Sequence, residues 1–276
     1  MKAFRQVFEF YLNSSIHVAL AVFSMAWITL IEFQQPFDTY VLYFILFASI
    51  TGYNFVKYFG IAKFHHRSLA SWLQIIQIFS LICFILMCYF GLHLDRKTIF
   101  YILGLGLITF LYAIPFLPKD IFIDKQLNLR SIGGLKVYVI GLVWVGVTVL
   151  LPLSNNDHHF DADVWITVVQ RFLFMIALML PFEIRDLQYD SLKLSTIPQR
   201  IGITNTKIIG ILLVMIYFFL EFLKDDIYPN EILIALLVTI ITMLFLVFSS
   251  KNQHEYYSSF FVESVPIVWL LLYFII

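Results

Sequence analysis

Nine apolar stretches of membrane-spanning length limit what this chain can fold into more than any other feature of its sequence. A helix needs roughly 20 mostly apolar residues to cross the hydrocarbon core of a bilayer. The sequence has such stretches at 14–33, 38–56, 71–92, 98–117, 132–153, 163–182, 206–223, 230–249 and 259–276. Only 13% of the residues are charged, whereas a soluble domain carries about 25%. We therefore predict an all-α, multi-pass membrane protein, with a nine-transmembrane-helix bundle that forms one domain over residues 1–276.

The distribution of lysine and arginine predicts the orientation of these helices. If the N-terminus lies in the cytoplasm, 14 basic residues fall in the N-terminal lead and in the cytoplasmic loops. Only Arg96, Lys97 and Lys224 fall on the opposite side, and Arg171 lies inside the sixth stretch. Because loops rich in Lys and Arg stay in the cytoplasm, we predict a cell-membrane protein with a cytoplasmic N-terminus. Nine spans then place the C-terminus on the opposite side.

Three carboxylates follow the sixth apolar stretch at helical spacing. Glu183 and Asp186 are three residues apart, and Asp186 and Asp190 are four residues apart. On a helix, at about 100° per residue, all three fall within roughly 60° of one another, where like charges repel unless a cation lies among them. A Mg2+ ion held by these carboxylates and by substrate phosphates would supply that cation. The alternative is a solvated helix end whose charge is balanced by Arg185 and Lys193.

The residues that follow the carboxylates make the pattern more specific. The pair Asp186 and Asp190, followed by Thr196, Pro198, Arg200 and Gly202, resembles the second aspartate motif of the UbiA-type intramembrane prenyltransferases. A tyrosine, prolines and a lysine where the fourth stretch ends (112–119) add to the resemblance, as do basic residues and glycines before the fifth (128–136). Members of that family are nine-helix bundles with cytoplasmic catalytic loops, in agreement with the predicted spans and orientation.

The resemblance implies transfer of a prenyl group from a prenyl diphosphate to a hydrophobic acceptor at the cytoplasmic membrane face. Loss of diphosphate would leave an allylic cation, which a lipophilic acceptor attacks. Asp186 and Asp190 would hold Mg2+, with Glu183 assisting. The substrate-binding side chains implied by the resemblance are Arg200, Lys119, Arg130 and Tyr112. Membrane lipid is a further expected partner, and no nucleic-acid partner is expected.

The chain departs from the family at the end of the second stretch. Most members carry a first motif there, Asn-Asp-x-x-Asp-x-x-x-Asp. In this sequence Asn54 remains, but the three aspartates are replaced by Phe55, Tyr58 and Ala62, and no carboxylate occurs between residues 39 and 94. In one interpretation Asn54 and Lys57 belong to the catalytic site with Asp186 and Asp190. Lys57 then supplies positive charge directly, and at most one Mg2+ remains on the second motif. In the other, the protein is a catalytically silent relative that binds a polyprenyl lipid or a membrane protein partner.

Two polar residues, His17 and Arg171, lie inside apolar stretches. We expect His17 to be a hydrogen-bonded packing residue rather than a ligand. Arg171 faces either the bundle interior or the outer membrane interface, since charges inside a membrane adopt one of these two positions. An ion-coupled transporter that uses Arg171, Glu183 and His17 is a third reading. Arg171 and Glu183 are too far apart on one helix for direct contact, and nothing else in the sequence favours transport.

Overall fold

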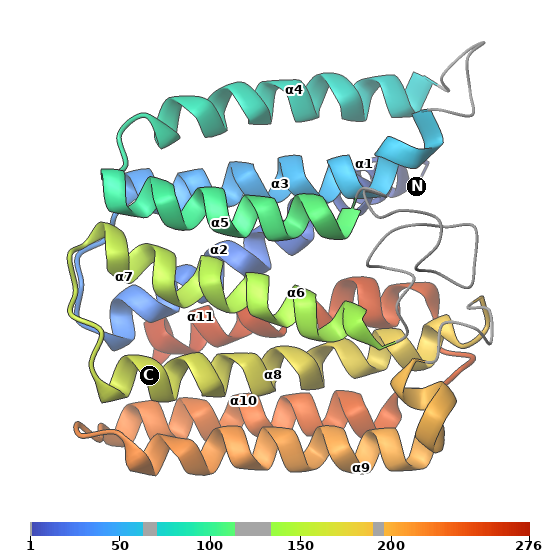
Figure 1. Cartoon of the computed structure of the whole chain (residues 1–276). Coiled ribbons are helices and arrows are strands. Elements are labelled where there is room, and N and C mark those ends of the chain that lie inside the picture. Colours follow the sequence, from blue (N-terminus) through green and yellow to red (C-terminus); the bar gives the residue numbers. More distant parts are fainter. Residues whose placement is uncertain (1, 63–70, 114–133, 190–195) are drawn as a thin grey trace, which may run out of the picture.

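The computed structural model describes residues 2–62, 71–113, 134–189 and 196–276. Within these ranges every regular element is a helix and there is no strand (Figure 1). The elements are α1 (Lys2–Asn13), α2 (Ile16–Glu32), α3 (Thr39–Ala62), α4 (Ser71–Gly91), α5 (Arg96–Ala113), α6 (Leu135–Val145), η3 (Gly146–Leu150), α7 (Leu151–Asn155), α8 (Ala162–Asp186), α9 (Ile197–Leu220), η5 (Glu221–Leu223), α10 (Pro229–Phe248), η6 (Tyr257–Val262) and α11 (Val265–Ile275).

Each predicted apolar stretch overlaps a helix, but not all of these helices meet the length and hydropathy of a membrane span. In the described part of the chain, seven do: Thr39–Tyr58, Trp72–Gly91, Leu135–Asn155, Ala162–Asp186, Ile197–Leu223, Pro229–Phe248 and Tyr257–Ile275. There are eight if α1 and α2, which meet at 57°, count as one broken span. The predicted all-α, multi-pass architecture is confirmed, and the number nine stays a prediction.

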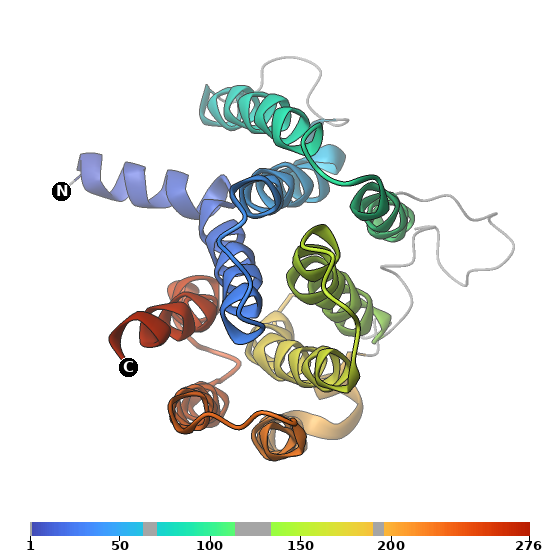
Figure 2. The same ribbon diagram turned by 90° about the vertical axis from the view of Figure 1, so that its left-hand side faces the viewer.

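The helix α2 lies inside the bundle, between α3, α11 and the π-helical segment η3 (Figure 2). Its side chains are buried along most of its length, and Ala19, Ala21 and Ala26 have no exposed surface. Small side chains let neighbouring membrane helices approach closely. Any polar group on α2 must therefore find its hydrogen-bond partners within the bundle, because neither water nor lipid can supply them.

Five elements that are distant in the sequence meet at one end of the bundle, which we call the motif end. There α3 and α8 end, and α6, α9 and η6 begin (Figure 1, right). α8 packs against α6 and α9 and also contacts η6. This packing places the end of α8, which carries the aspartate motif, beside the first turn of α6.

Candidate functional site

The carboxylates of the motif lie on the last turn of α8 and share one cationic partner. α8 continues past the predicted end at 182, so Glu183 and Asp186 are both helical. The ammonium nitrogen of Lys136, in the first turn of α6, lies 3.0 Å from Glu183 Oε1 and 3.5 Å from Asp186 Oδ2. Glu183 is 1% exposed and Asp186 is 21% exposed. The two carboxylates therefore do face one point, and an amino group occupies it.

A second cation contacts Asp186 from its own helix. Arg185 donates to Asp186 Oδ1 through Nε at 2.9 Å and through Nη2 at 2.8 Å. The same guanidinium lies 5.4 Å from the centre of the Phe182 ring. Asp186 is thus placed between Arg185 and Lys136, and each of its two oxygen atoms has a cationic neighbour.

The positive charges of Arg185 and Lys57 both act on a third carboxylate, Glu263. Glu263 follows η6 directly in the sequence, and Lys57 lies near the end of α3. The motif end therefore combines basic side chains from α3, α6 and α8 with the carboxyl groups of Glu183, Asp186 and Glu263. Lys57, which could substitute for a metal ion by its charge, shares this electrostatic influence on Glu263 with Arg185 of the motif helix.

Asn54 and Lys57 also fasten the corner between α1 and α2. The Asn54 amide donates to Ser14 O at 2.9 Å and to Ser80 Oγ at 2.8 Å, and its oxygen accepts from Ser15 Oγ at 2.8 Å. Lys57 Nζ donates to Asn13 O at 3.3 Å. Asn54 is 3% exposed, so its amide holds three segments of the bundle together.

A pocket of about 500 Å³ opens beside the end of α8. Its lining is rich in hydrogen-bond donors and comprises Arg185, Asp186, Gln188, Tyr189, Asn252, Gln253 and Glu255. Gln188 donates to Lys251 O and Asn252 Oδ1, and Gln253 donates to Pro181 O at 3.2 Å. These bonds join the motif to the segment before η6. The lining combines one guanidinium and three side-chain amides with the carboxylates of Asp186 and Glu255. An anionic group with several acceptor oxygens would bind here chiefly through the Arg185 guanidinium.

The second half of the motif forms a short helical turn followed by a bend. Gln199 Oε1 accepts from the Thr196 backbone N–H at 3.0 Å, and Pro198 lies in the first turn of α9. Gly202 then adopts φ 80° and ψ 164°, a conformation that only glycine adopts readily. α9 continues beyond the bend. Proline and glycine thus have backbone roles here, and they leave Arg200 as an exposed side chain on the turn.

Several predicted site residues fall outside the described part of the chain. They are Asp190, Lys119 and Arg130, together with the side chain of Tyr112. Their predicted roles in binding metal or substrate stay predictions. Of the predicted residues that the structure does describe, Glu183 and Asp186 meet at Lys136, Arg200 lies on the exposed turn, and Asn54 and Lys57 adjoin the α1–α2 corner.

The described residues do not fit a Mg2+ ion as they stand. Glu183 and Asp186 have oxygen ligands of the kind that Mg2+ prefers. However, Lys136 occupies the point at which both carboxylates converge. No group of three or more His, Cys, Asp or Glu side chains in the described ranges is arranged to hold a metal ion. Mg2+ on this motif would require Lys136 to move away.

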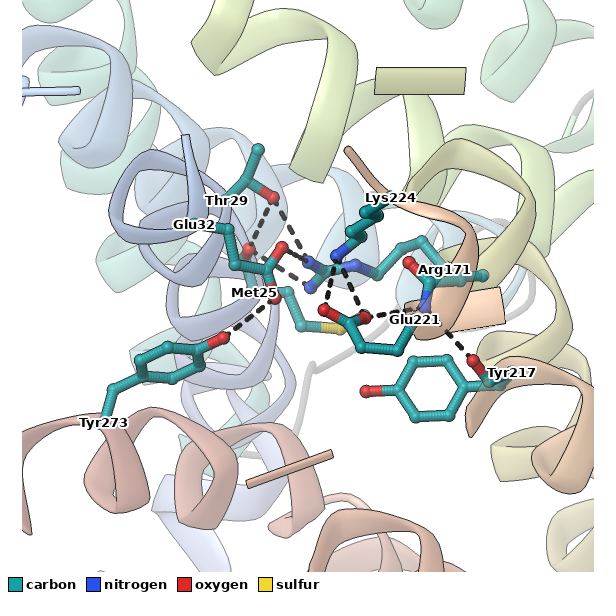
Figure 3. Close-up of polar contacts among 9 residues, drawn as sticks. Met25, Thr29, Glu32, Arg171, Tyr217, Glu221, Lys224 and Tyr273 are labelled. Carbon is teal, nitrogen blue, oxygen red and sulfur yellow. Dashed lines mark hydrogen bonds and ion pairs between the residues drawn. The ribbon is translucent and has the colours of Figure 1, made fainter. Parts of the chain in front are cut away.

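Arg171 lies in a buried polar cluster remote from the motif end (Figure 3). Its side chain is 1% exposed and donates to Met25 O at 3.2 Å, Thr29 Oγ1 at 3.2 Å and Glu32 Oε2 at 3.5 Å. The prediction that Arg171 faces the bundle interior is the correct one of the two alternatives. Its contacts named here do not include Glu183 or His17, so the trio required by the transporter reading is not assembled.

The same cluster continues to the end of α9. Both oxygens of Glu221 lie 3.0 Å from Lys224 Nζ, and one accepts from Gln170 at 2.8 Å. Tyr273 donates to Glu32 at 3.1 Å. Burial opposes the charge on Lys224, but Glu32 and Glu221 outweigh burial and raise the pKa of the ammonium. The cluster joins α2, α8, the end of α9 and α11 through ion pairs and hydrogen bonds.

His17 is a hydrogen-bonded packing residue, as expected. Its ring nitrogens lie 2.7 Å from Tyr11 Oη and 2.9 Å from Phe260 O. The ring also stacks on Phe260, with centroids 4.9 Å apart.

The sequence reasoning missed the roles of Lys136 and Glu263 at the motif end. Lys136 counted only as one of the basic residues that set the orientation, and Glu263 lies inside the last apolar stretch. Lys136 is 47 residues away from Glu183 in the sequence, so no local spacing connects them. The one available signal was topological. The fifth and sixth predicted spans run in opposite directions, so the start of the fifth and the end of the sixth lie at the same membrane face.

The fold resembles solved structures over nearly the whole chain, although neither a protein-family model nor a curated protein matches the sequence. A digeranylgeranylglyceryl phosphate synthase aligns with a TM-score of 0.57 at 14% identity, over 98% of each chain. A UbiA homolog from Archaeoglobus fulgidus aligns with a TM-score of 0.53 at 13% identity, over 100% of this chain and 98% of the homolog. The same homolog bound to GPP and Mg2+ gives 0.54 and 13%, over 100% and 99%. The chain therefore has the UbiA-type fold, and the resemblance is confirmed at that level.

Proposed function

We propose that the protein binds a prenyl diphosphate at the motif end and transfers the prenyl group to a hydrophobic acceptor in the membrane. The observation that carries this proposal is the charged cluster at the end of α8, within a fold shared over the full chain with a homolog bound to GPP and Mg2+. The cytoplasmic face follows from the distribution of basic residues. Residues 1–276 would act as one transmembrane domain.

The described side chains supply the means to hold a diphosphate. Arg185 lines the pocket with the amides of Gln188, Asn252 and Gln253, and Arg200 is exposed on the nearby turn. A guanidinium can bind two phosphate oxygens at once. Charge that develops on a departing diphosphate is stabilised by cations held in place in advance. Asp186 fixes the Arg185 guanidinium through two hydrogen bonds, so this cation is oriented before the ligand arrives.

The predicted Mg2+ ligands are Asp186 and Asp190, with Glu183 assisting. A bound Mg2+ would add charge neutralisation of the diphosphate, but it would compete with Lys136 for Glu183 and Asp186. The hydrophobic acceptor and the prenyl chain would both approach from the bilayer, in which the surrounding helices expose apolar side chains.

Binding and transfer can be tested on the full chain in lipid nanodiscs. We expect a non-hydrolysable thiolodiphosphate analogue of GPP to bind, and radiolabelled GPP to release diphosphate when membrane lipid extract supplies the acceptor. Arg185→Gln should weaken analogue binding, whereas Arg5→Gln, at an exposed ion pair on α1, should not. If the wild type does not bind the analogue in Mg2+ and does not bind it in EDTA, the proposed ligand is wrong.

The second candidate is the silent lipid-binding relative. It is favoured by the pairing of Glu183 and Asp186 with cations from the chain itself and by the loss of the first aspartate motif. Binding of the analogue with no release of diphosphate from GPP, across a range of lipid acceptors, would select this candidate over transfer.

A further inference from the structure

We infer that Lys136 takes the place of a divalent cation between Glu183 and Asp186, so that the motif end binds its diphosphate ligand without Mg2+. The identity of the ligand rests on the proposed function. The part played by Lys136 rests on the geometry of the site and can be tested without any ligand.

The first support is the shared contact. Oxygen atoms from two carboxylates, three residues apart on α8, approach the same nitrogen at 3.0 Å and 3.5 Å. A Mg2+ ion would need these same oxygens as ligands at much shorter range. It cannot occupy the gap while the ammonium is there, because the two cations would repel one another and compete for the same lone pairs.

The second support is burial. Glu183 is 1% exposed, and a buried carboxylate must have a charged or hydrogen-bonding partner. Lys136 is one such partner, at hydrogen-bonding distance, and it comes from another helix. Removal of the ammonium would take one positive charge away from two neighbouring carboxylates and so favour the binding of another cation between them. The motif can thus exist in two forms, with either a lysine or a metal ion, and the wild-type sequence favours the lysine.

The third support is the position of Lys136 on its own helix. Gly134 adopts φ 77°, and α6 begins at Leu135, so Lys136 is the second residue of the helix. The N-terminus of a helix carries partial positive charge and disfavours a cation. A lysine in the first turn is therefore locally unfavourable, and a residue that contradicts the local preference of its helix requires a compensating tertiary contact. The two carboxylates of α8 provide that compensation.

The fourth support is the remaining charge around the motif. Arg185 contacts the other oxygen of Asp186, and Lys57 and Arg185 act on Glu263. The segment that corresponds to the first aspartate motif has no carboxylate. Glu183 is paired with Lys136, and Asp186 is paired with both Lys136 and Arg185. Lys136 is therefore a positioning residue that fixes Asp186, which in turn orients Arg185 toward the pocket.

The test compares wild type with Lys136→Met and Lys136→Arg in nanodiscs. Affinity for the thiolodiphosphate analogue of GPP is measured in EDTA and in millimolar Mg2+. We expect similar affinities for wild type and Lys136→Arg in both conditions. Lys136→Met should bind about tenfold more weakly in EDTA and recover in Mg2+, a difference of about 1.4 kcal/mol. A purely structural lysine would not make binding depend on Mg2+.

A direct metal titration removes the dependence on the ligand. Binding of Mn2+, followed by electron paramagnetic resonance, should be weak in wild type and in Lys136→Arg and clearly stronger in Lys136→Met. Lys97→Met, at an exposed ion pair with Asp157, is the matched control and should behave as wild type. Tight Mn2+ binding by wild type, or analogue binding that requires Mg2+ in wild type, would overturn the inference.

The outcomes also separate this inference from the proposed function. If no variant binds the analogue but Lys136→Met gains Mn2+ affinity, the proposed ligand is wrong and the role of Lys136 stands. If Lys136→Met does not fold, the wild-type titration and Lys136→Arg still decide the question, since both must show metal-independent binding.

Discussion

The guanidinium carbon of Arg171 lies 4.7 Å from the centre of the Trp269 ring, in a region where both side chains are almost completely buried. Arg171 belongs to α8 and Trp269 to α11, and the guanidinium also contacts α2 through Met25, Thr29 and Glu32. One side chain thus joins three helices. Such contacts make the stability of the bundle sensitive to this position.

Arg171→Met should destabilise the protein strongly. The substitution breaks the buried ion pair between Arg171 and Glu32, and removal of one partner of a buried ion pair typically costs about 3–5 kcal/mol. Thermal unfolding in detergent, followed by intrinsic fluorescence, should show a large fall in the midpoint. The exposed Lys97→Met serves as control and should leave the midpoint in place. Equal midpoints for Arg171→Met and wild type would show that the cluster contributes little to stability.

Gly202→Ala should lower stability through the backbone alone. Gly202 has φ 80° and ψ 164°, and an added Cβ would meet no atom within 4 Å. The cost is therefore conformational, about 1–3 kcal/mol. Gly104→Ala is the matched control, because its Cβ also meets no neighbour and alanine is favoured in a helix interior by up to about 1 kcal/mol. The two variants should shift the unfolding midpoint in opposite directions.

Asn54→Ala should act on the α1–α2 corner. It leaves Ser14 O and Ser15 Oγ without the partner seen in the structure, and an unsatisfied buried polar group costs about 1–3 kcal/mol. We expect a lower unfolding midpoint and an unchanged affinity for the diphosphate analogue. The exposed Gln77→Ala on α4 is the control. Loss of affinity at an unchanged midpoint would instead support the catalytic role that the family resemblance implies for Asn54.

The predicted orientation can be tested with two exposed histidines at opposite ends of the bundle. In a background without Cys83 and the exposed Cys88, His159→Cys and His254→Cys are treated with a membrane-impermeant thiol reagent on intact cells. We expect labelling of the His159 variant from outside, and of the His254 variant only after the membrane is permeabilised. The reverse pattern would place the motif end on the external face.

The long apolar stretches predicted the helices well, but their polar ends escaped the same reasoning. The sixth apolar stretch covers 163–182, whereas α8 runs over Ala162–Asp186. The seventh begins at 206, whereas α9 begins at Ile197. A helix can continue with polar residues once it leaves the apolar layer, so hydropathy marks only its central part. Here the added turns carry the motif.

The partners of charged residues were harder to predict than the helices. Arg171 and Glu32 are 139 residues apart, and a single charge in an apolar stretch has no period from which its direction could be read. Helical spacing predicted that Glu183 and Asp186 face the same side. The structure agrees, since both carboxylates contact Lys136. The identity of the cation between the two carboxylates depends on how α6 packs against α8. That packing is determined by residues along both helices and not by a local motif.

The position of α2 has a consequence for the biogenesis of the protein. α2 comes early in the element order, yet it packs against α11, which follows it far along the chain. Glu32 and Tyr273, which are 241 residues apart, share a hydrogen bond. Until α11 is inserted, this face of α2 lacks the packing of α11 and the hydroxyl that Tyr273 donates to Glu32. Release of a nascent chain that lacks α11 would leave this face of α2 without its neighbouring helix.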